Sequence, residues 1–475
     1  MITLFFTEMW ERMSYYGMRA LLVLFMVDAV QKGGLGLDDK TATAIYGLYT
    51  AVVYLSALPG GWLGDRLLGA RGGVWWGGIV IAVGHLVLGV SGSHSFYLGL
   101  LLVALGSGLL KSNMSALVGQ LYPEGGARRD AGFTLFYMGV NLGGFMGPLV
   151  CSLLGEHYGW RWGFSAAAGG MILGLVQFQL TKRHLGDAGL RLAHPPASLR
   201  RDWLLFGAGA GALALFTVLA LMEVIQLNPI WMASNTAILI VTIAVAYFLW
   251  AFFGAGLDAR EKKQLGVIAI LFLASAIFWA GFEQVGSSFT IFAERFTVRT
   301  IGTWEMPAGW FQSFNPLFVI ALAPLVAALW IRLARRGLSP SLPVKLAWGL
   351  LLLAAGFLVA AWAAQRALTT GPVWPTWLIT VFLLHTIGEL FLSPVGLSAV
   401  TKLAPARLAG MTMGVWFLGT ALGNVVAGLL AGQVTGDETS AMPARFLQVV
   451  WTTGAAGLLL WVFARWIKRL MPGVE

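Results

Sequence analysis

Apolar runs of about 20 residues recur along the whole chain. A run of this length crosses the hydrocarbon core of a bilayer as an α-helix, because a helix satisfies its own backbone hydrogen bonds where water is absent. Only 11% of the residues are charged and the mean hydropathy is +0.78, whereas a soluble domain carries about 25% charged residues. The sequence therefore predicts an all-α integral membrane protein.

Fourteen transmembrane helices are expected between the charged or Gly/Pro-rich breaks. Their approximate limits are 2–30, 41–64, 73–91, 96–119, 131–155, 161–181, 203–222, 236–256, 265–293, 308–331, 346–365, 375–401, 408–432 and 446–467. Long polar breaks at 182–202 and 258–264 separate groups of six, two and six. We therefore expect an N-terminal six-helix bundle over 1–182, a linker with two additional transmembrane helices over 183–264, and a C-terminal six-helix bundle over 265–475.

Lys and Arg residues are distributed unevenly between alternate loops. With the N-terminus placed in the cytoplasm, 21 of the 31 Lys and Arg residues lie in cytoplasmic loops or the C-terminal tail, and seven lie in the opposite loops. Positive residues collect on the cytoplasmic side of membrane proteins. The formal charge of +10 therefore indicates topology, with both termini in the cytoplasm, and not a nucleic-acid partner.

The ends of the chain and its single cysteine give little information on fold or function. No cleavable signal peptide is expected, because the first apolar segment carries charges and continues into the fold. The chain begins almost at this segment, so whether the natural gene product has a short N-terminal extension stays open. Cys151 is the only cysteine, which excludes an internal disulfide.

Seven ionisable residues lie inside the expected spans. A charged side chain at mid-membrane costs about 2.5–3.5 kcal/mol on insertion scales, so such residues usually face a cavity or pair with one another. They are Glu8, Glu11, Arg12, Arg19, Lys111, Glu283 and Glu389. This set predicts a polar cavity formed by both halves of the chain.

The first span places its polar residues on one helical face. Glu8, Glu11, Arg12, Tyr15, Tyr16 and Arg19 follow one another at i, i+3, i+4, i+7, i+8 and i+11. Residues three or four apart are neighbours on a helix surface. Glu8 and Arg12 are therefore expected to form an ion pair with the acid on the N-terminal side, which is the better orientation.

Prolines are expected to disturb two later spans beside polar residues. Pro394 follows Glu389 and should kink or unwind its helix, and Pro316 follows Asn315 in the same manner. The freed backbone groups would need a polar cavity. His385 precedes Glu389 by four residues on the same face, and we expect it to pack or to form a hydrogen bond.

The seven charges leave one carboxylate unmatched, because four are acids and three are bases. Burial favours the neutral, protonated form of a carboxylate without a partner. The hypothesis is that proton uptake by one carboxylate releases its basic partner and permits a conformational change. Which carboxylate takes the proton stays open among Glu8, Glu11 and Glu283.

These residues also carry a family resemblance. Residues 8–16 (EMWERMSYY) resemble the ExxERFxYY motif on helix 1 of the proton-coupled oligopeptide transporters of the major facilitator superfamily, with Met13 in place of Phe. Residues 60–66 (GGWLGDR) are similar to the superfamily's loop between helices two and three, and residues 136–143 (FYMGVNLG) resemble the family's FYxxINxG signature. The resemblance runs from about residue 4 to residue 424. Bacterial members typically have two extra helices between the halves, in agreement with fourteen spans.

The resemblance implies a role for each matched residue. Glu8, Glu11 and Arg12 would couple protons, with Glu283 a further candidate. The substrate-binding residues would be Arg12, Tyr16, Tyr54, Lys111, Asn141, Asn315, Glu389, Ser393 and Trp416. Within this set Arg12 and Lys111 would hold the peptide carboxylate, and Glu389 with the two asparagines would receive the amino terminus. Trp416 would line a side-chain pocket, although a packing or interfacial role is equally open.

The resemblance further implies two gate pairs, Arg19 with Glu283 and Lys111 with Glu389. It implies proton-driven import of di- and tripeptides across the bacterial inner membrane by a monomer that needs no cofactor and no metal. The termini of an extended dipeptide lie about 6–7 Å apart. A site with bases on one side and a carboxylate on the other would bind both termini and tolerate varied side chains.

Other functions compete with peptide import. The same fold could carry nitrate, amino acids or another small solute, although an anion would have no use for Glu389. A membrane enzyme would need a catalytic or metal constellation, and the six histidines show no ligand spacing. A channel would need a filter-like repeat, which the sequence does not contain. The sequence therefore favours a proton-coupled transporter.

Overall fold

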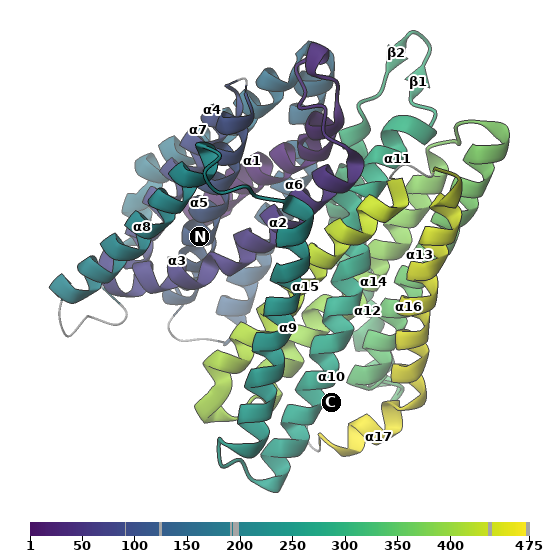
Figure 1. The fold of residues 1–475 in the computed structure, drawn as a ribbon. Coiled ribbons are helices and arrows are strands. Elements are labelled where there is room, and N and C mark those ends of the chain that lie inside the picture. The colour runs from purple at the N-terminus through teal and green to yellow at the C-terminus, as the bar shows by residue number, and fades with distance from the viewer. Residues whose placement is uncertain (91, 123–125, 191, 193–198, 436–438, 472–475) are drawn as a thin grey trace. The chain divides into compact units, whose positions relative to one another are not determined.

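The computed structural model describes residues 1–90, 92–122, 126–190, 192, 199–435 and 439–471. Regular structure in this part of the chain is almost entirely helical (Figure 1). The described strands are β1 (Thr300–Ile301) and β2 (Trp304–Glu305), which pair antiparallel in a small hairpin. The prediction of an all-helical membrane protein is confirmed.

The chain divides into two compact units, which we describe separately. The N-terminal unit comprises residues 1–37 and 52–232, and the C-terminal unit comprises 38–51 and 233–475. Helix α2 (Asp39–Leu55) begins in the C-terminal unit and ends in the N-terminal unit. The other long helices of the N-terminal unit are α1 (Ile2–Val27), α4 (Gly69–Leu88), α5 (Ser93–Gln120), α6 (Gly126–Tyr158), α7 (Trp160–Thr181) and α8 (Leu199–Leu221), with a short α3 (Ala57–Leu63).

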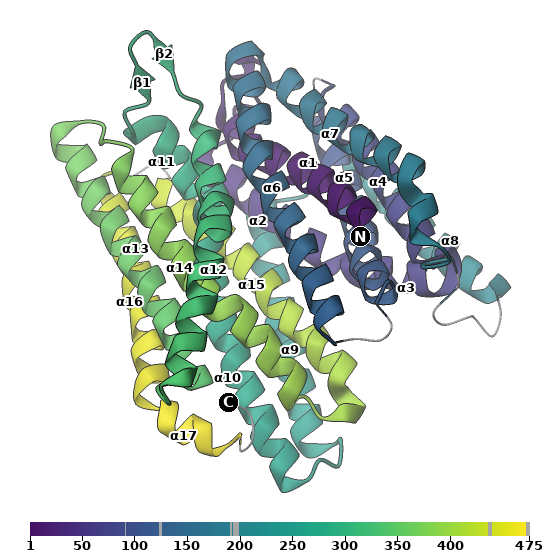
Figure 2. The same cartoon turned by 180° about the vertical axis from the view of Figure 1, so that it is seen from behind.

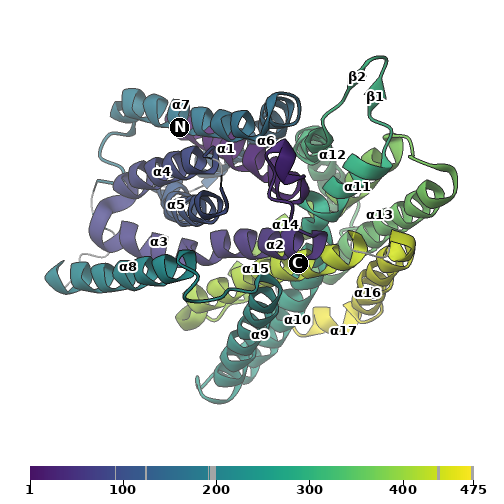
Figure 3. The ribbon, with the colours of Figure 1, turned by 45° about the horizontal axis from the view of Figure 1, so that its top comes forward.

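The C-terminal unit contains most of the remaining helices. They are α9 (Pro229–Phe253), α10 (Ala259–Phe282), α11 (Ser288–Phe296), α12 (Phe314–Arg335), α13 (Leu342–Thr370), α14 (Thr376–Leu403), α15 (Ala409–Thr435), α16 (Met442–Val462) and α17 (Ala464–Arg469). Helix α13 packs against α14 and α16, and α10 packs against α15. Figure 3 shows α16 alongside α13.

Twelve segments of the described chain are long and apolar enough to cross a membrane, against fourteen expected. Helix α1 is not among them because it carries Glu8, Glu11, Arg12 and Arg19. The second and third expected spans fall in a single 50-residue segment, Asp39–Leu88. The number of membrane crossings therefore stays a prediction.

The unwinding expected at the two prolines is not found, and a kink at Pro394 stays a prediction. Helix α14 runs unbroken from Thr376 to Leu403 with Pro394 inside it, so the backbone beside Glu389 is not unwound. Pro316 lies in the first turn of α12, which begins at Phe314. A proline there costs little, because the first N–H groups of a helix have no intrahelical partner.

Small residues bring α1 and α6 into close backbone contact. A Cβ added at Gly147 would clash with the Met13 carbonyl oxygen and would lie 2.7 Å from the Gly17 nitrogen. A Cβ at Gly143 would lie 2.8 Å from the Cβ of Arg12. Such close approach through glycines is typical of membrane helix pairs. Figure 2 shows α1 beside α6.

Substituting Gly147 by Ala should therefore destabilise the N-terminal unit. The added methyl group overfills a tight contact, and overpacking costs about 1–3 kcal/mol. Gly169→Ala is the matched control, because a Cβ at Gly169 meets nothing within 4 Å. The thermal unfolding midpoint of the purified protein in detergent should fall for Gly147→Ala and stay within error for Gly169→Ala. Equal midpoints would contradict the glycine-mediated packing.

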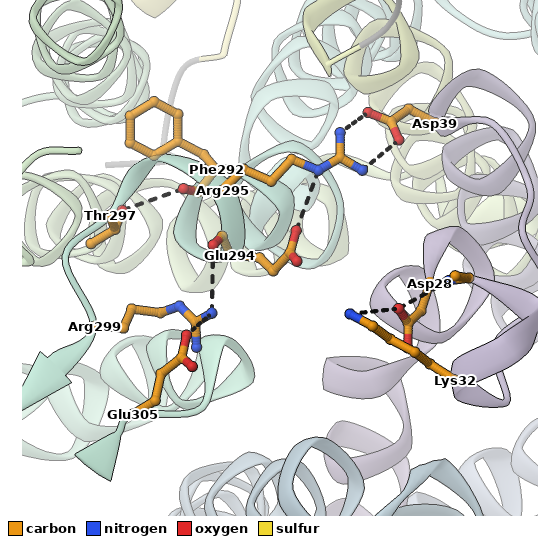
Figure 4. A network of polar contacts seen from close by, with 10 residues as sticks. Asp28, Lys32, Asp39, Phe292, Glu294, Arg295, Thr297, Arg299 and Glu305 are labelled. Carbon is orange, nitrogen blue, oxygen red and sulfur yellow. Dashed lines mark hydrogen bonds and ion pairs between the residues drawn. The ribbon is translucent and has the colours of Figure 1, made fainter. Parts of the chain in front are cut away.

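Two arginines fix the end of α11 within the C-terminal unit (Figure 4). Arg295 Nη1 and Nη2 donate to the two carboxylate oxygens of Asp39 in the first turn of α2, at 2.8 and 3.0 Å. Arg299 Nη2 lies 2.7 Å from Glu305 Oε1, and its Nη1 donates to the Met306 carbonyl. A bidentate pair restricts orientation as well as distance. The start of α2, the end of α11 and the hairpin are thereby held together.

Candidate functional site

The predicted ion pair on α1 is present and has a third member. Arg12 Nε donates to Glu8 Oε1 at 2.8 Å and lies 2.7 Å from Glu11 Oε2. The three residues are 5%, 3% and 0% exposed in the order Arg12, Glu8, Glu11. Two buried carboxylates thus share one guanidinium.

This acidic cluster, defined as Glu8, Glu11 and Arg12, is not fully satisfied. In the described part of the chain, Glu8 Oε2, Glu11 Oε1 and Arg12 Nη2 are buried and have no hydrogen-bond partner. An unsatisfied buried polar atom costs free energy, more so when it is charged. The charges of the three groups sum to minus one when both acids are ionised. The cluster is therefore suited to hold one proton on a carboxylate.

Aromatic rings border the bases of the N-terminal unit. The guanidinium carbon of Arg12 lies 5.4 Å from the ring centroid of Tyr15, and that of Arg19 lies 5.7 Å from the Tyr16 centroid. Such contacts stabilise a cation without neutralising it. The rings therefore add to the interactions of both guanidinium groups and leave their charge unchanged.

Tyr54 and Lys111 come from different helices and meet. The Lys111 ammonium lies 4.2 Å from the centroid of the Tyr54 ring. Tyr54 lies near the end of α2 and Lys111 in the second half of α5. The structure thus brings together two residues that the resemblance places on the same ligand. Asn141 on α6 is buried and donates to the Tyr137 carbonyl one turn earlier.

The C-terminal unit contains a second polar cluster, around Glu389. Asn315 Nδ2 donates to Glu389 Oε2 at 2.9 Å and to Thr386 Oγ1 at 3.1 Å. Asn315 lies in the first turn of α12 and the other two lie on α14. Thr386 was missed by the sequence analysis, although it precedes Glu389 by three residues and so shares its helical face. The Asn315 amide thereby orients the Glu389 carboxylate.

Ser393 and Trp416 were also predicted to bind substrate. Ser393 lies one turn after Glu389 on α14 and is half-buried. Trp416 on α15 is 5% exposed and packs against α14, since a Cβ at Gly396 would lie 2.7 Å from its Cη2 atom. Trp416 therefore packs tightly within the unit, as the alternative reading expected. A role in a side-chain pocket stays a prediction.

Glu283 lies where one predicted span is interrupted. The sequence predicted one helix over 265–293, whereas α10 ends at Phe282 and a 3₁₀ turn, Glu283–Gly286, precedes α11. Glu283 and Gln284 are both buried. Gln284 accepts a hydrogen bond from Ser288 Oγ at 3.0 Å and donates to the Ala280 carbonyl. Gln284 was not predicted from the sequence; its amide donates to a backbone carbonyl of the last turn of α10, beside the interruption.

His385 packs among aromatic rings, as expected. Its ring centroid lies 5.0, 5.7 and 6.4 Å from those of Phe357, Phe289 and Phe282. The two predicted gate pairs each join residues of different units, Arg19 with Glu283 and Lys111 with Glu389. The geometry within each unit does not test these pairs, and they stay predictions.

Comparisons with known proteins agree with these observations. The family model PTR2, described as the POT family, matches residues 73–447. "Peptide transporter YePEPT" of Yersinia enterocolitica is 41% identical over 490 residues, which cover 99% of this chain and 95% of the relative. The "Di-/tripeptide transporter" of Lactococcus lactis subsp. cremoris is 34% identical, with 100% and 97% covered.

Solved structures agree as well. A crystal structure of a peptide transporter POT in complex with sulfate has a TM-score of 0.92 and 40% identity, and covers 99% of this chain and 95% of that chain. The prediction of a transporter, and not an enzyme, is confirmed by the family. The chain belongs to the POT family, the proton-coupled oligopeptide transporters that its first helix resembles.

Proposed function

We propose that this POT-family transporter imports di- and tripeptides together with protons by alternating access. The observation that carries the proposal is the buried acidic cluster, in which Glu8 and Glu11 share Arg12. A relative named for di- and tripeptide transport and full-length similarity support the substrate class.

Protonation of one carboxylate would change the net charge of the acidic cluster from minus one to zero. One acid would then stay with Arg12 and the other would be neutral, which lowers the cost of burial. An inward proton yields about 2.3 kcal/mol per 100 mV. That energy supports roughly fiftyfold accumulation of a net-neutral solute, since a tenfold ratio requires about 1.4 kcal/mol.

Peptide binding would use both polar clusters. Arg12 and Lys111 would hold the peptide carboxylate, and Glu389 would hold the amino terminus. Tyr16, Tyr54, Asn141 and Asn315 would contact the peptide backbone or its termini, and Ser393 and Trp416 would lie near its side chains. The Asn315–Glu389 hydrogen bond supports this assignment because it fixes the carboxylate before the peptide arrives.

The remaining predictions concern topology and gating. We propose fourteen membrane crossings, arranged as two six-helix bundles with two helices between them, and both termini in the cytoplasm of a bacterium. The transporter would act as a monomer in the inner membrane. Arg19 with Glu283 and Lys111 with Glu389 would form the gates, and Glu283 would be a further protonation site.

Uptake into proteoliposomes with an inward proton gradient tests this function. A labelled dipeptide should accumulate above its external concentration, and unlabelled tripeptides should compete. Nitrate and free amino acids should not compete, because neither presents both termini at dipeptide spacing. Equal uptake without a gradient would refute proton coupling. Competition by nitrate or by amino acids, but not by dipeptides, would refute the substrate class.

A further inference from the structure

A pocket in the C-terminal unit lies on the face of α14 that is turned away from Glu389. It has a volume of about 200 Å³ and is lined by the start of α13 and the last turns of α14. Lys402 and Ser398 line it and follow Glu389 by thirteen and nine residues, which puts them roughly on the opposite side of a 3.6-residue helix. The pocket is therefore distinct from the proposed peptide site.

Two lysines share this pocket. Lys345 of α13 and Lys402 of α14 both line it. The Lys345 ammonium lies 4.9 Å from the ring centroid of Trp330, and in the described part of the chain neither lysine forms an ion pair with a carboxylate. Two like charges in one pocket repel each other. An anion between them would remove the repulsion.

The pocket lies at a strongly positive end of the unit. The stretch from Arg332 to Lys345, which joins α12 to α13, contains three arginines and one lysine and no acidic residue. Trp348, one turn into α13, is 48% exposed. Exposed tryptophans collect at the level of the lipid headgroups, and basic residues near that level attract anionic lipids. Both features place the pocket at headgroup depth.

We propose that this pocket binds the phosphate headgroup of an anionic phospholipid such as phosphatidylglycerol. Lys345, Lys402 and the Ser398 hydroxyl would donate to the phosphate oxygens. The rest of the lining is apolar, with Leu342 and Val395 among it, and suits the glycerol and the upper acyl carbons. Pockets for drug-sized ligands measure about 300–1,000 Å³, so this smaller one fits the polar end of a lipid and leaves most of the acyl chains outside.

Native mass spectrometry of the full chain in detergent tests the site. With phosphatidylglycerol and phosphatidylcholine at equal concentration, phosphatidylglycerol adducts should predominate. K345A/K402A should weaken apparent phosphatidylglycerol affinity by roughly tenfold or more. K262A/K263A is the matched control, because these lysines are exposed at the start of α10 in the same unit. Unchanged binding in K345A/K402A, or an equal loss in the control, would overturn the proposal.

Two further measurements distinguish a lipid phosphate from free inorganic phosphate and control for misfolding of the double variant. Inorganic phosphate should not displace phosphatidylglycerol at the same concentration, and displacement would assign the pocket to a free anion instead of a lipid. K345R/K402R keeps both charges and should retain the lipid preference. Lys402 is exposed, so K402A alone should fold and lose a smaller part of the affinity. No loss in a folded K402A would overturn the proposal.

Discussion

Replacing Glu8 by Gln is expected to abolish peptide uptake driven by a proton gradient and to leave counterflow exchange of peptide intact. Glutamine keeps the size of the side chain and an oxygen for the 2.8 Å hydrogen bond from Arg12 Nε. It cannot take up a proton, and Glu11 and Arg12 are left as a balanced pair. Gradient-driven accumulation requires a group that changes its charge, whereas exchange of peptide on both sides does not.

Both measurements use proteoliposomes that contain equal amounts of transporter. Glu223→Gln is the matched control, because Glu223 is exposed in the connection between α8 and α9. It should behave like the parent protein in both assays. Loss of uptake and exchange together in Glu8→Gln would mean that Glu8 binds substrate or holds the fold. Retained gradient-driven uptake would mean that Glu8 is not the coupling group, and the same substitution would then be tested at Glu11.

Replacing Glu389 by Gln should remove the preference for a free amino terminus. A charge-assisted hydrogen bond contributes about 1.5–3 kcal/mol, so affinity for a dipeptide relative to its N-acetylated form should fall roughly tenfold to a hundredfold. The ratio of half-inhibitory concentrations in a competition assay measures this preference directly.

Thr386→Val tests the hydrogen bonds that orient Glu389 without changing the charge of the Glu389 carboxylate. This change removes the second acceptor of Asn315, at 3.1 Å, and leaves the Asn315–Glu389 hydrogen bond in place. It should reduce the preference by a smaller factor than Glu389→Gln. An unchanged preference in Glu389→Gln would contradict the assignment of the amino terminus to this carboxylate.

Contacts within one helix could be predicted from the sequence, because spacing alone determines them. The Glu8–Arg12 ion pair followed from an i,i+4 interval. The second contact of Arg12, with the adjacent Glu11, depends on which way the guanidinium turns inside a packed unit, and spacing does not determine that. The membrane class followed from apolar content, whereas the number of crossings depends on how Asp39–Leu88 is divided.

Predictions from local sequence were wrong where packing against the rest of the fold determines the backbone conformation. Pro394 has a strong intrinsic tendency to break helices, yet α14 continues through it. The interruption of the neighbouring span occurs instead at Glu283–Gly286, where no proline stands. The Asn315–Glu389 hydrogen bond joins residues 74 positions apart. Such a contact depends on the packing of α12 against α14, which periodicity does not reveal.

The glycine contacts between α1 and α6 also limit how the N-terminal unit can move. Met13 and Gly17 meet Gly147 with no room for a methyl group, so sliding one helix past the other would drive backbone atoms into each other. The two helices should therefore behave as one rigid body during slow collective motions. Arg12 and Asn141 would be carried together, at a nearly constant separation. Any change that a peptide senses at these two residues must then come from side-chain rotation or from a different helix.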